Sequence, residues 1–161
     1  MPFVYAIGLP ASVASLTTCG TTNVELAALA MRQATRNFDL QAVYASGFAN
    51  AATSISGIGF RVRRWTSAGS GGTAITPAPR RIGTTAATTA ASNSGGAITV
   101  GTVDGSTQCA FGCGASGPGG WVAPDIDSRV TVEAGSADEL LVYTIATPTS
   151  LPFQVSSEIV E

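Results

Sequence analysis

The chain has 161 residues, of which 45% are hydrophobic and 11% are charged, and its formal net charge is −2. A chain of this length fits one domain that buries roughly two thirds of its unfolded surface, and this hydrophobic content excludes a disordered polar chain. Ordinary soluble domains carry about 25% charged residues, so much of this surface must consist of small neutral side chains. Such a surface suits a subunit covered by neighbours, because charges are depleted at interface cores; an Ala- and Thr-rich monomer is the alternative.

The basic residues exclude several kinds of catalytic site. The sequence contains no His, and all eight of its basic residues are Arg. Catalytic triads and metal sites that use His, Schiff bases on Lys and the phosphate-binding Lys of P-loops therefore cannot form within this chain. We expect a protein that is not an enzyme and that uses no cofactor.

The cysteines and the N-terminus bear on the cellular compartment. Cys19, Cys109 and Cys113 are too few for a structural zinc site without His, so we expect buried free thiols. A Cys109–Cys113 disulfide is the alternative, since Gly112 and Gly114 would allow a tight turn. The first ten residues lack the basic start of a signal peptide, and no apolar run reaches membrane-spanning length. The expectation is assembly in a cytoplasm and no membrane partner.

The first predicted element is a helix over residues 22–35. A capping-box pattern, Thr-Asn-Val-Glu, opens this stretch, and Leu26, Leu29 and Ala30 follow at helical spacing. The same Ala- and Leu-rich residues could equally form an extended arm against a neighbouring subunit. We therefore expect residues 1–35 to be an N-terminal arm that contains this short helix.

From residue 36 onward the sequence favours short strands. Phe38, Leu40, Ala42 and Tyr44 alternate with other residues, which predicts that these four share one face of a strand ending at Gly47. In the next strand, over residues 55–64, two apolar positions alternate with two arginines. Further strands are expected at residues 97–100, 108–111, 129–133, 139–145 and 153–156, while residues 67–81 predict a long excursion at one end of a sheet.

About eight short strands with no crossover helix predict an all-β fold, an antiparallel β-sandwich or jelly roll. The prediction is a single domain over residues 1–161, in which residues 36–161 form the sandwich. Between the strands, the Ser-, Thr- and Ala-rich residues 83–97 predict a flexible loop or a segment ordered by a partner. The Gly-rich residues 117–120 predict a turn.

Two motifs match known binding patterns but have a simpler interpretation. Residues 112–117 fit the G-x-G-x-x-G dinucleotide fingerprint, but Pro118 and the glycines after it prevent the helix that would hold the pyrophosphate. Asp125 and Asp127 could begin a calcium site or a pair of catalytic carboxylates. A solvated turn after Pro124 is the interpretation we prefer, so no metal site is expected.

The candidate interface is an arginine cluster beside a tryptophan, made of Arg61, Arg63, Arg64, Trp65, Arg80 and Arg81. A nucleic-acid partner is not expected, because the whole chain is slightly acidic and such binding needs a basic domain. We expect these guanidinium groups to bind carboxylates of a neighbouring subunit, a contact in which Arg is favoured over Lys. The alternative is pairing within the chain, with Asp39, Glu133 or a similar carboxylate.

The order of these features resembles a known family. A strand ending in Arg63-Arg64 leads into the loop TSAGSGGT of residues 66–73, and a low-complexity middle and a C-terminal strand pair follow, which begins at Arg129 and runs through Tyr143. This order, over about half of the chain, resembles the decoration or cement proteins of tailed-bacteriophage heads, small structural proteins with β-sandwich or jelly-roll folds. Residues before 36 and the stretch from Cys109 to Gly120 lie outside the resemblance.

The resemblance implies a virion structural protein on the capsid surface. Such subunits, commonly homotrimers, bind the major capsid protein and stabilise the lattice against internal DNA pressure. A tail, fibre or head-fibre base subunit is the first alternative. A carbohydrate-binding jelly roll is the second, for which Trp65 and Trp121 would have to supply the exposed aromatic surface.

Overall fold

The computed structural model describes residues 3–8, 17–18, 26–32, 35–47, 57–67, 69–81, 83–92, 97–101, 104–114, 117–144 and 152–161. These residues form strands and loops and contain no helix, so no helix among them could span a membrane. Every strand pair between them is antiparallel. The predicted all-β, antiparallel class is therefore confirmed.

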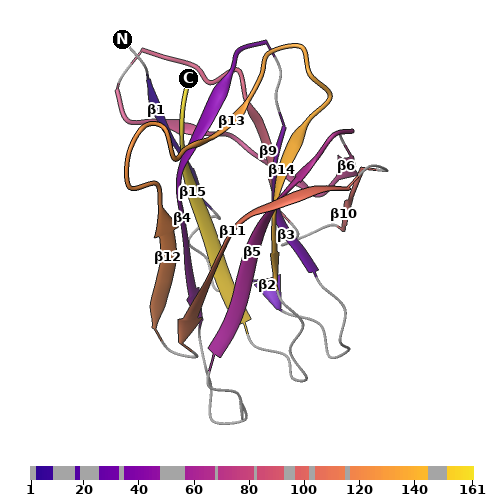
Figure 1. Ribbon diagram of the computed structural model, residues 1–161, viewed down its shortest axis with the longest axis vertical. Helices are drawn as coiled ribbons and strands as arrows, with labels where there is room; N and C mark the ends of the chain where they lie inside the picture. The colour runs from indigo at the N-terminus through magenta and orange to yellow at the C-terminus, as the bar shows by residue number, and fades with distance from the viewer. Residues whose placement is uncertain are drawn as a thin grey trace.

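The strands form two large sheets and one small one (Figure 1). The seven-stranded sheet contains β1 (Val4–Gly8), β2 (Thr17–Thr18), β4 (Phe38–Gly47), β8 (Ala78–Pro79), β12 (Pro118–Val122), β13 (Val130–Val132) and β15 (Pro152–Val160). The six-stranded sheet contains β3 (Leu26–Arg32), β5 (Gly57–Trp65), β7 (Thr73–Ile75), β9 (Thr89–Ser92), β11 (Asp104–Gly114) and β14 (Glu139–Thr144). The two-stranded sheet pairs β6 (Ser70–Gly71) with β10 (Ile98–Thr99).

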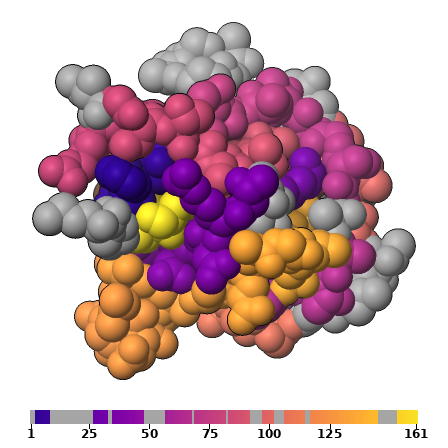
Figure 2. All heavy atoms as spheres, turned by 90° about the horizontal axis from the view of Figure 1, so that it is seen from above, coloured from indigo at the N-terminus to yellow at the C-terminus, as the bar shows by residue number. Residues whose placement is uncertain are grey.

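The two large sheets pack face to face around one core. Ile7 and Val155 from the seven-stranded sheet and Leu29 and Val62 from the six-stranded sheet belong to the same buried cluster. Within the seven-stranded sheet the order is β12-β4-β15-β1-β8, and within the other it is β11-β5-β14-β3-β9-β7. The chain ends meet at one end of this two-layered arrangement, where the yellow C-terminal residues lie beside indigo β1 (Figure 2).

The predicted helix over residues 22–35 is wrong, because Leu26–Arg32 is strand β3, between β14 and β9. Its apolar residues serve two buried faces. Leu29 and Met31 face the core, while Ala27 and Ala30 face a smaller cluster on the outer side. A register shift between β3 and β14 breaks the simple alternation, so the apolar spacing imitates that of a helix. Helix propensity is a weak preference that tertiary packing overrides.

The first 35 residues contribute strands to both sheets. Val4–Gly8 pairs with β15 and β8, and Leu26–Arg32 pairs with β14 and β9. These two segments therefore belong to the body of the fold and not to a separate arm. The predicted capping box at residues 22–25 lies outside the described residues.

Strand β4 differs from its predicted pattern at one point. Its pairing with β15 shifts register between Leu40 and Ala42, which is the position of a β-bulge. Beyond this shift Val43 and Ala45 face the core, and Tyr44 lies on the outer face with 41% of its surface exposed. The prediction that Tyr44 shares a face with Phe38 and Leu40 is therefore wrong, because a shift of one residue moves every following side chain to the other face.

The biased segment 83–97 is also more ordered than predicted. Residues 89–92 form β9, whose Ala90 and Ala91 are buried between β3 and β7. The carboxylate of Glu161 accepts hydrogen bonds from the backbone N–H groups of Ala87, at 3.0 and 2.9 Å, and of Thr88, at 2.7 Å. Strand pairing and this C-terminal side chain hold residues 87–92 within the fold; residues 93–96 lie outside the description.

Of the Gly-rich residues 117–120, predicted as a turn, Pro118, Gly119 and Gly120 begin strand β12 instead, and Gly117 directly precedes it. β12 lies beside β4 at the edge of one sheet and approaches β11 at the edge of the other. A Cβ added at Gly119 would lie 1.8 Å from the carbonyl oxygen of Gly112. The absence of side chains therefore lets the backbones of the two sheets meet at this edge.

This contact predicts that substitution by Ala destabilises the protein much more at Gly119 than at Gly117. Gly119→Ala should lower the free energy of unfolding by about 3 kcal/mol, because a backbone must move to admit the methyl group. Gly117→Ala is the matched control, since a Cβ there meets nothing within 4 Å. Urea unfolding followed by circular dichroism measures both, and equal stabilities of the two variants would contradict the close approach.

Candidate functional site

The acidic and thiol side chains of the described residues form no cluster suited to a metal ion. No group of three or more His, Cys, Asp or Glu residues in this part of the chain could hold a metal ion. Asp125 lies in the exposed loop after β12, where it accepts hydrogen bonds from the Ser128 backbone N–H, at 2.8 Å, and hydroxyl, at 2.6 Å. These bonds lower the pKa of Asp125. The geometry is that of a solvated turn, which was the preferred interpretation of the Asp125 and Asp127 pair.

Cys109 and Cys113 lie in the same strand, β11, and are free. Four residues of extended chain span about 13 Å, too far for a disulfide, whose Cα atoms lie within about 7 Å. Burial raises the pKa of Cys109 to about 11 and also raises that of Cys113. Both groups are therefore protonated at neutral pH and are poor nucleophiles. Cys19 lies outside the described residues.

Among the described residues, no helix follows the dinucleotide fingerprint. Gly112 and Gly114 end strand β11, and Gly117 directly precedes strand β12. The backbone N–H of Gly117 donates to the carbonyl of Gly114 at 3.4 Å. Since pyrophosphate binding depends on a helix N-terminus, these glycines are explained by the contact between the sheet edges.

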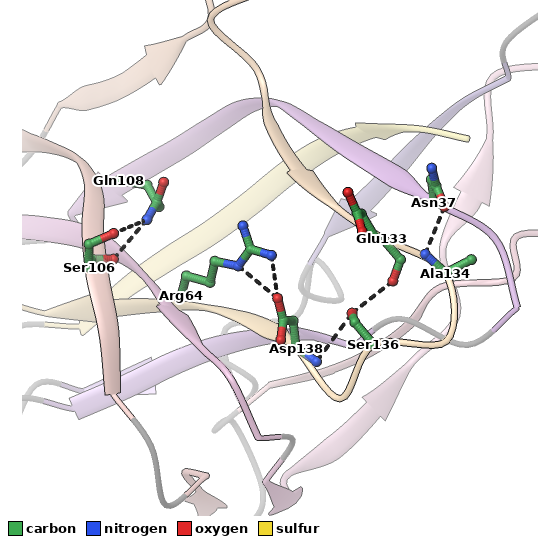
Figure 3. A network of polar contacts seen from close by, with 8 residues as sticks. All are labelled: Asn37, Arg64, Ser106, Gln108, Glu133, Ala134, Ser136 and Asp138. Carbon is green, nitrogen blue, oxygen red and sulfur yellow. Dashed lines mark hydrogen bonds and ion pairs between the residues drawn. The ribbon is translucent and has the colours of Figure 1, made fainter.

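The predicted arginine cluster is divided over several parts of the surface. Arg64 pairs with Asp138, at the start of the segment that enters β14, through an Nε–Oδ2 contact of 2.8 Å and a second contact from Nη2 (Figure 3). Arg80 follows β8 and pairs with Glu158 on the seven-stranded sheet. Arg81 is exposed beside it. The alternative of pairing within the chain thus holds for Arg64 and Arg80, although with partners other than Asp39 and Glu133.

The other members form a compact group on the outer face of the six-stranded sheet. Arg61, Arg63 and Trp65 alternate along β5 and are half-buried. The guanidinium carbon of Arg63 lies 5.4 Å from the centre of the Trp65 ring and 5.6 Å from that of Tyr143. The two rings are 6.4 Å apart. We call Arg63, Trp65 and Tyr143 the arginine–aromatic stack. Cation–π attraction to the two rings fixes the orientation of the Arg63 guanidinium group.

Residues 69–71 of the glycine-rich loop are fixed beside this stack. Glu139 is fully buried and pairs with the Arg32 Nε at 2.9 Å. Its other oxygen accepts a hydrogen bond from the Gly69 N–H at 3.0 Å, and Arg32 also donates to the carbonyls of Ser70, at 3.2 Å, and Gly71, at 3.4 Å. The ion pair therefore ties the glycine-rich loop to the ends of β3 and β14.

A second surface was missed by the sequence predictions. On the outer face of the seven-stranded sheet, a hollow of about 120 Å³ is lined by Tyr44, Ala45, Ser46, Gln154 and Ser156. We call it the Tyr44 hollow. The tryptophans predicted for an exposed aromatic surface lie elsewhere: Trp121 packs on the core and Trp65 on the outer cluster. The sequence did not indicate that Tyr44 is exposed, because the β-bulge that turns its side chain outward has no recognisable sequence pattern.

Comparison of the chain with protein-family models, with curated protein sequences and with solved structures found no significant match.

Proposed function

We propose that this chain is a structural protein of a tailed-phage particle, a decoration or cement subunit that binds the outer surface of the capsid and stabilises its lattice. The proposed partners are the major capsid protein and two further copies of the chain in a homotrimer. The proposal assigns no catalytic residue, cofactor or nucleic-acid partner.

We further propose that the two sheets form a jelly roll, and the strand order supports this. Four pairs are nested one inside the other along the chain: β1 with β15, β3 with β14, β4 with β12, and β5 with β11. Successive pairs alternate between the two large sheets, from the outermost pair to the innermost pair. A long hairpin that winds into a jelly roll has this arrangement. The five strands β6 to β10 are then an insertion between the innermost pair. Jelly rolls are common in viral capsid and lectin domains.

The arginine–aromatic stack is the observation that carries the proposed docking role. Trp, Tyr and Arg are the residues most enriched among those that dominate binding energy, and the position of Arg63 over two rings holds its guanidinium in one plane. A planar guanidinium fork matches a carboxylate of a neighbouring subunit. The remaining surface composition, rich in small neutral residues, allows close contact without the removal of many charges from water.

Co-sedimentation tests this function. The purified chain is mixed with expanded, DNA-free capsids assembled from the major capsid protein encoded with it, after its solution mass has been measured by light scattering. We expect a trimer that binds at a saturable ratio, and an Arg63→Ala variant that binds at least about tenfold more weakly. Arg129→Ala, which removes the same charge elsewhere, should bind like the natural chain.

The outcomes separate the proposal from its alternatives. No binding to capsids at any concentration would contradict the decoration role and favour a tail, fibre or head-fibre base subunit with the same fold. Binding that Arg63→Ala leaves unchanged would keep the role but remove the arginine–aromatic stack from the interface. Circular dichroism of each variant checks that it is folded.

A further inference from the structure

The Tyr44 hollow combines one exposed aromatic ring with neutral polar groups. Tyr44 is 41% exposed, the largest exposure of an aromatic side chain among the described residues whose exposure is known. Ser46 follows it on the same face of β4, and Gln154 and Ser156 lie opposite on β15, at the register positions Gln154–Ser46 and Ser156–Tyr44. The hollow therefore lies between two central strands of a rigid sheet, which hold the four side chains at constant spacing.

The chemistry of the lining points to one class of ligand. Hydroxyl and amide groups both donate and accept hydrogen bonds, as sugar hydroxyls do, and an aromatic ring offers a flat apolar surface with one polar end. No Arg, Asp or Glu lines the hollow, so it lacks the groups that recognise phosphates, carboxylates or cations. We propose that the Tyr44 hollow binds one unit of a neutral saccharide chain, with a sugar ring lying against Tyr44.

The size and openness of the site agree with this assignment. A hollow of about 120 Å³ has room for several water molecules, which suits part of a single sugar ring. Beside the hollow, exposed Gly120 pairs with Tyr44, and exposed Gly8 pairs with Ser156. These positions have no side chains that would block an extended chain on either side. The site is on the opposite outer face from the arginine–aromatic stack, so the inference does not depend on the proposed docking role.

A titration followed by NMR tests the inference on the full-length chain. Maltohexaose, cellohexaose, chitohexaose and xylohexaose are added separately to isotopically labelled protein, with a polygalacturonate fragment as the charged comparison. We expect at least one neutral hexasaccharide to move the backbone amide signals of Tyr44, Ser46, Gln154 and Ser156, with a dissociation constant below about 10 mM. Polygalacturonate should not move them.

Variants assign the binding to the hollow. Tyr44→Ala should weaken binding about tenfold, because it removes the ring surface, and Tyr44→Phe should keep it within about threefold. Val122→Ala is the matched control, since Val122 is exposed on the same face, two register positions from the Gly120–Tyr44 pair, but does not line the hollow. Light scattering at the NMR concentration shows whether these residues are instead covered by another copy.

Two results would overturn the inference. One is that no neutral hexasaccharide moves these signals at about 10 mM. The other is that Tyr44→Ala dissociates an oligomer of the natural chain, which would make the hollow an interface between copies. Loss of sugar binding with unchanged capsid binding, or the reverse, would show that the two surfaces act separately.

Discussion

Arg32→Ala is expected to lower the free energy of unfolding by about 3 kcal/mol, because it leaves the carboxylate of Glu139 buried without its cation. Glu139 is fully buried at the start of β14, and its partner Arg32 is 18% exposed. The loss of Arg32 also removes the hydrogen bonds to the carbonyls of Ser70 and Gly71. Guanidinium chloride unfolding, followed by tryptophan fluorescence, measures the change.

Two comparisons separate the buried charge from other effects. Arg80→Ala breaks a pair whose arginine is 59% exposed, and should cost less than about 1 kcal/mol. Arg32→Ala combined with Glu139→Gln should be more stable than Arg32→Ala alone, since the amide has no charge and can still accept from the Gly69 N–H. If Arg32→Ala cost no more than Arg80→Ala, the ion pair would contribute little to the attachment of the loop.

Phe60→Ala is expected to lower the free energy of unfolding by about 4 kcal/mol. The Phe60 ring is fully buried and joins the two sheets. It stacks on Phe111 from its own sheet, with centroids 5.4 Å apart, and meets Phe153 from the other sheet edge-on at 5.3 Å. Removal of the ring leaves a cavity between the sheets, and urea unfolding measures the cost.

Phe111→Ala is the matched control for this prediction. Phe111 belongs to the same ring stack but lies on the edge strand β11 and is half-buried, so its loss should cost about 2 kcal/mol. If the Phe60→Ala chain does not fold, Phe60→Leu keeps the comparison possible with a cost of about 1.5 kcal/mol. Equal effects at positions 60 and 111 would contradict a core shared by both sheets.

The class of fold and many strand positions could be read from the sequence. Alternation in residues 57–65 placed Phe60 and Val62 inside and Arg61 and Arg63 outside, as the structure has them. The strands near residues 38–47 and 139–144 were also found where predicted, while the strand predicted at residues 153–156 is part of the longer strand Pro152–Val160. In residues 38–47, 57–65 and 153–160 a side-chain period of two is visible, because one face of each strand is buried and the other is partly exposed. Residues 139–144 are buried throughout and contain Val, Tyr and Thr, which favour strands.

The strands that were missed lack that signal. β3 is buried on both faces and its Ala- and Leu-rich sequence has helical spacing, while β9 has two alanines at its centre and β12 begins with Pro-Gly-Gly. Ala, Gly and Pro have low intrinsic preference for strands. They become strands because neighbouring backbones pair with them and because small side chains fit where the sheets come close.

The sequence by itself determined the all-β class, the lack of the residues that many enzymes need, and the alternation of Arg61 and Arg63 with core residues along one strand. Only the tertiary structure decided which side chains meet. It paired Arg64 with Asp138 and Arg80 with Glu158, placed Arg63 over Trp65 and Tyr143, and turned Tyr44 outward through a single register shift. The physical reason is that strand order and register are long-range properties: contacts between residues as far apart as Arg32 and Glu139 depend on backbone pairing, which no local pattern in the sequence encodes.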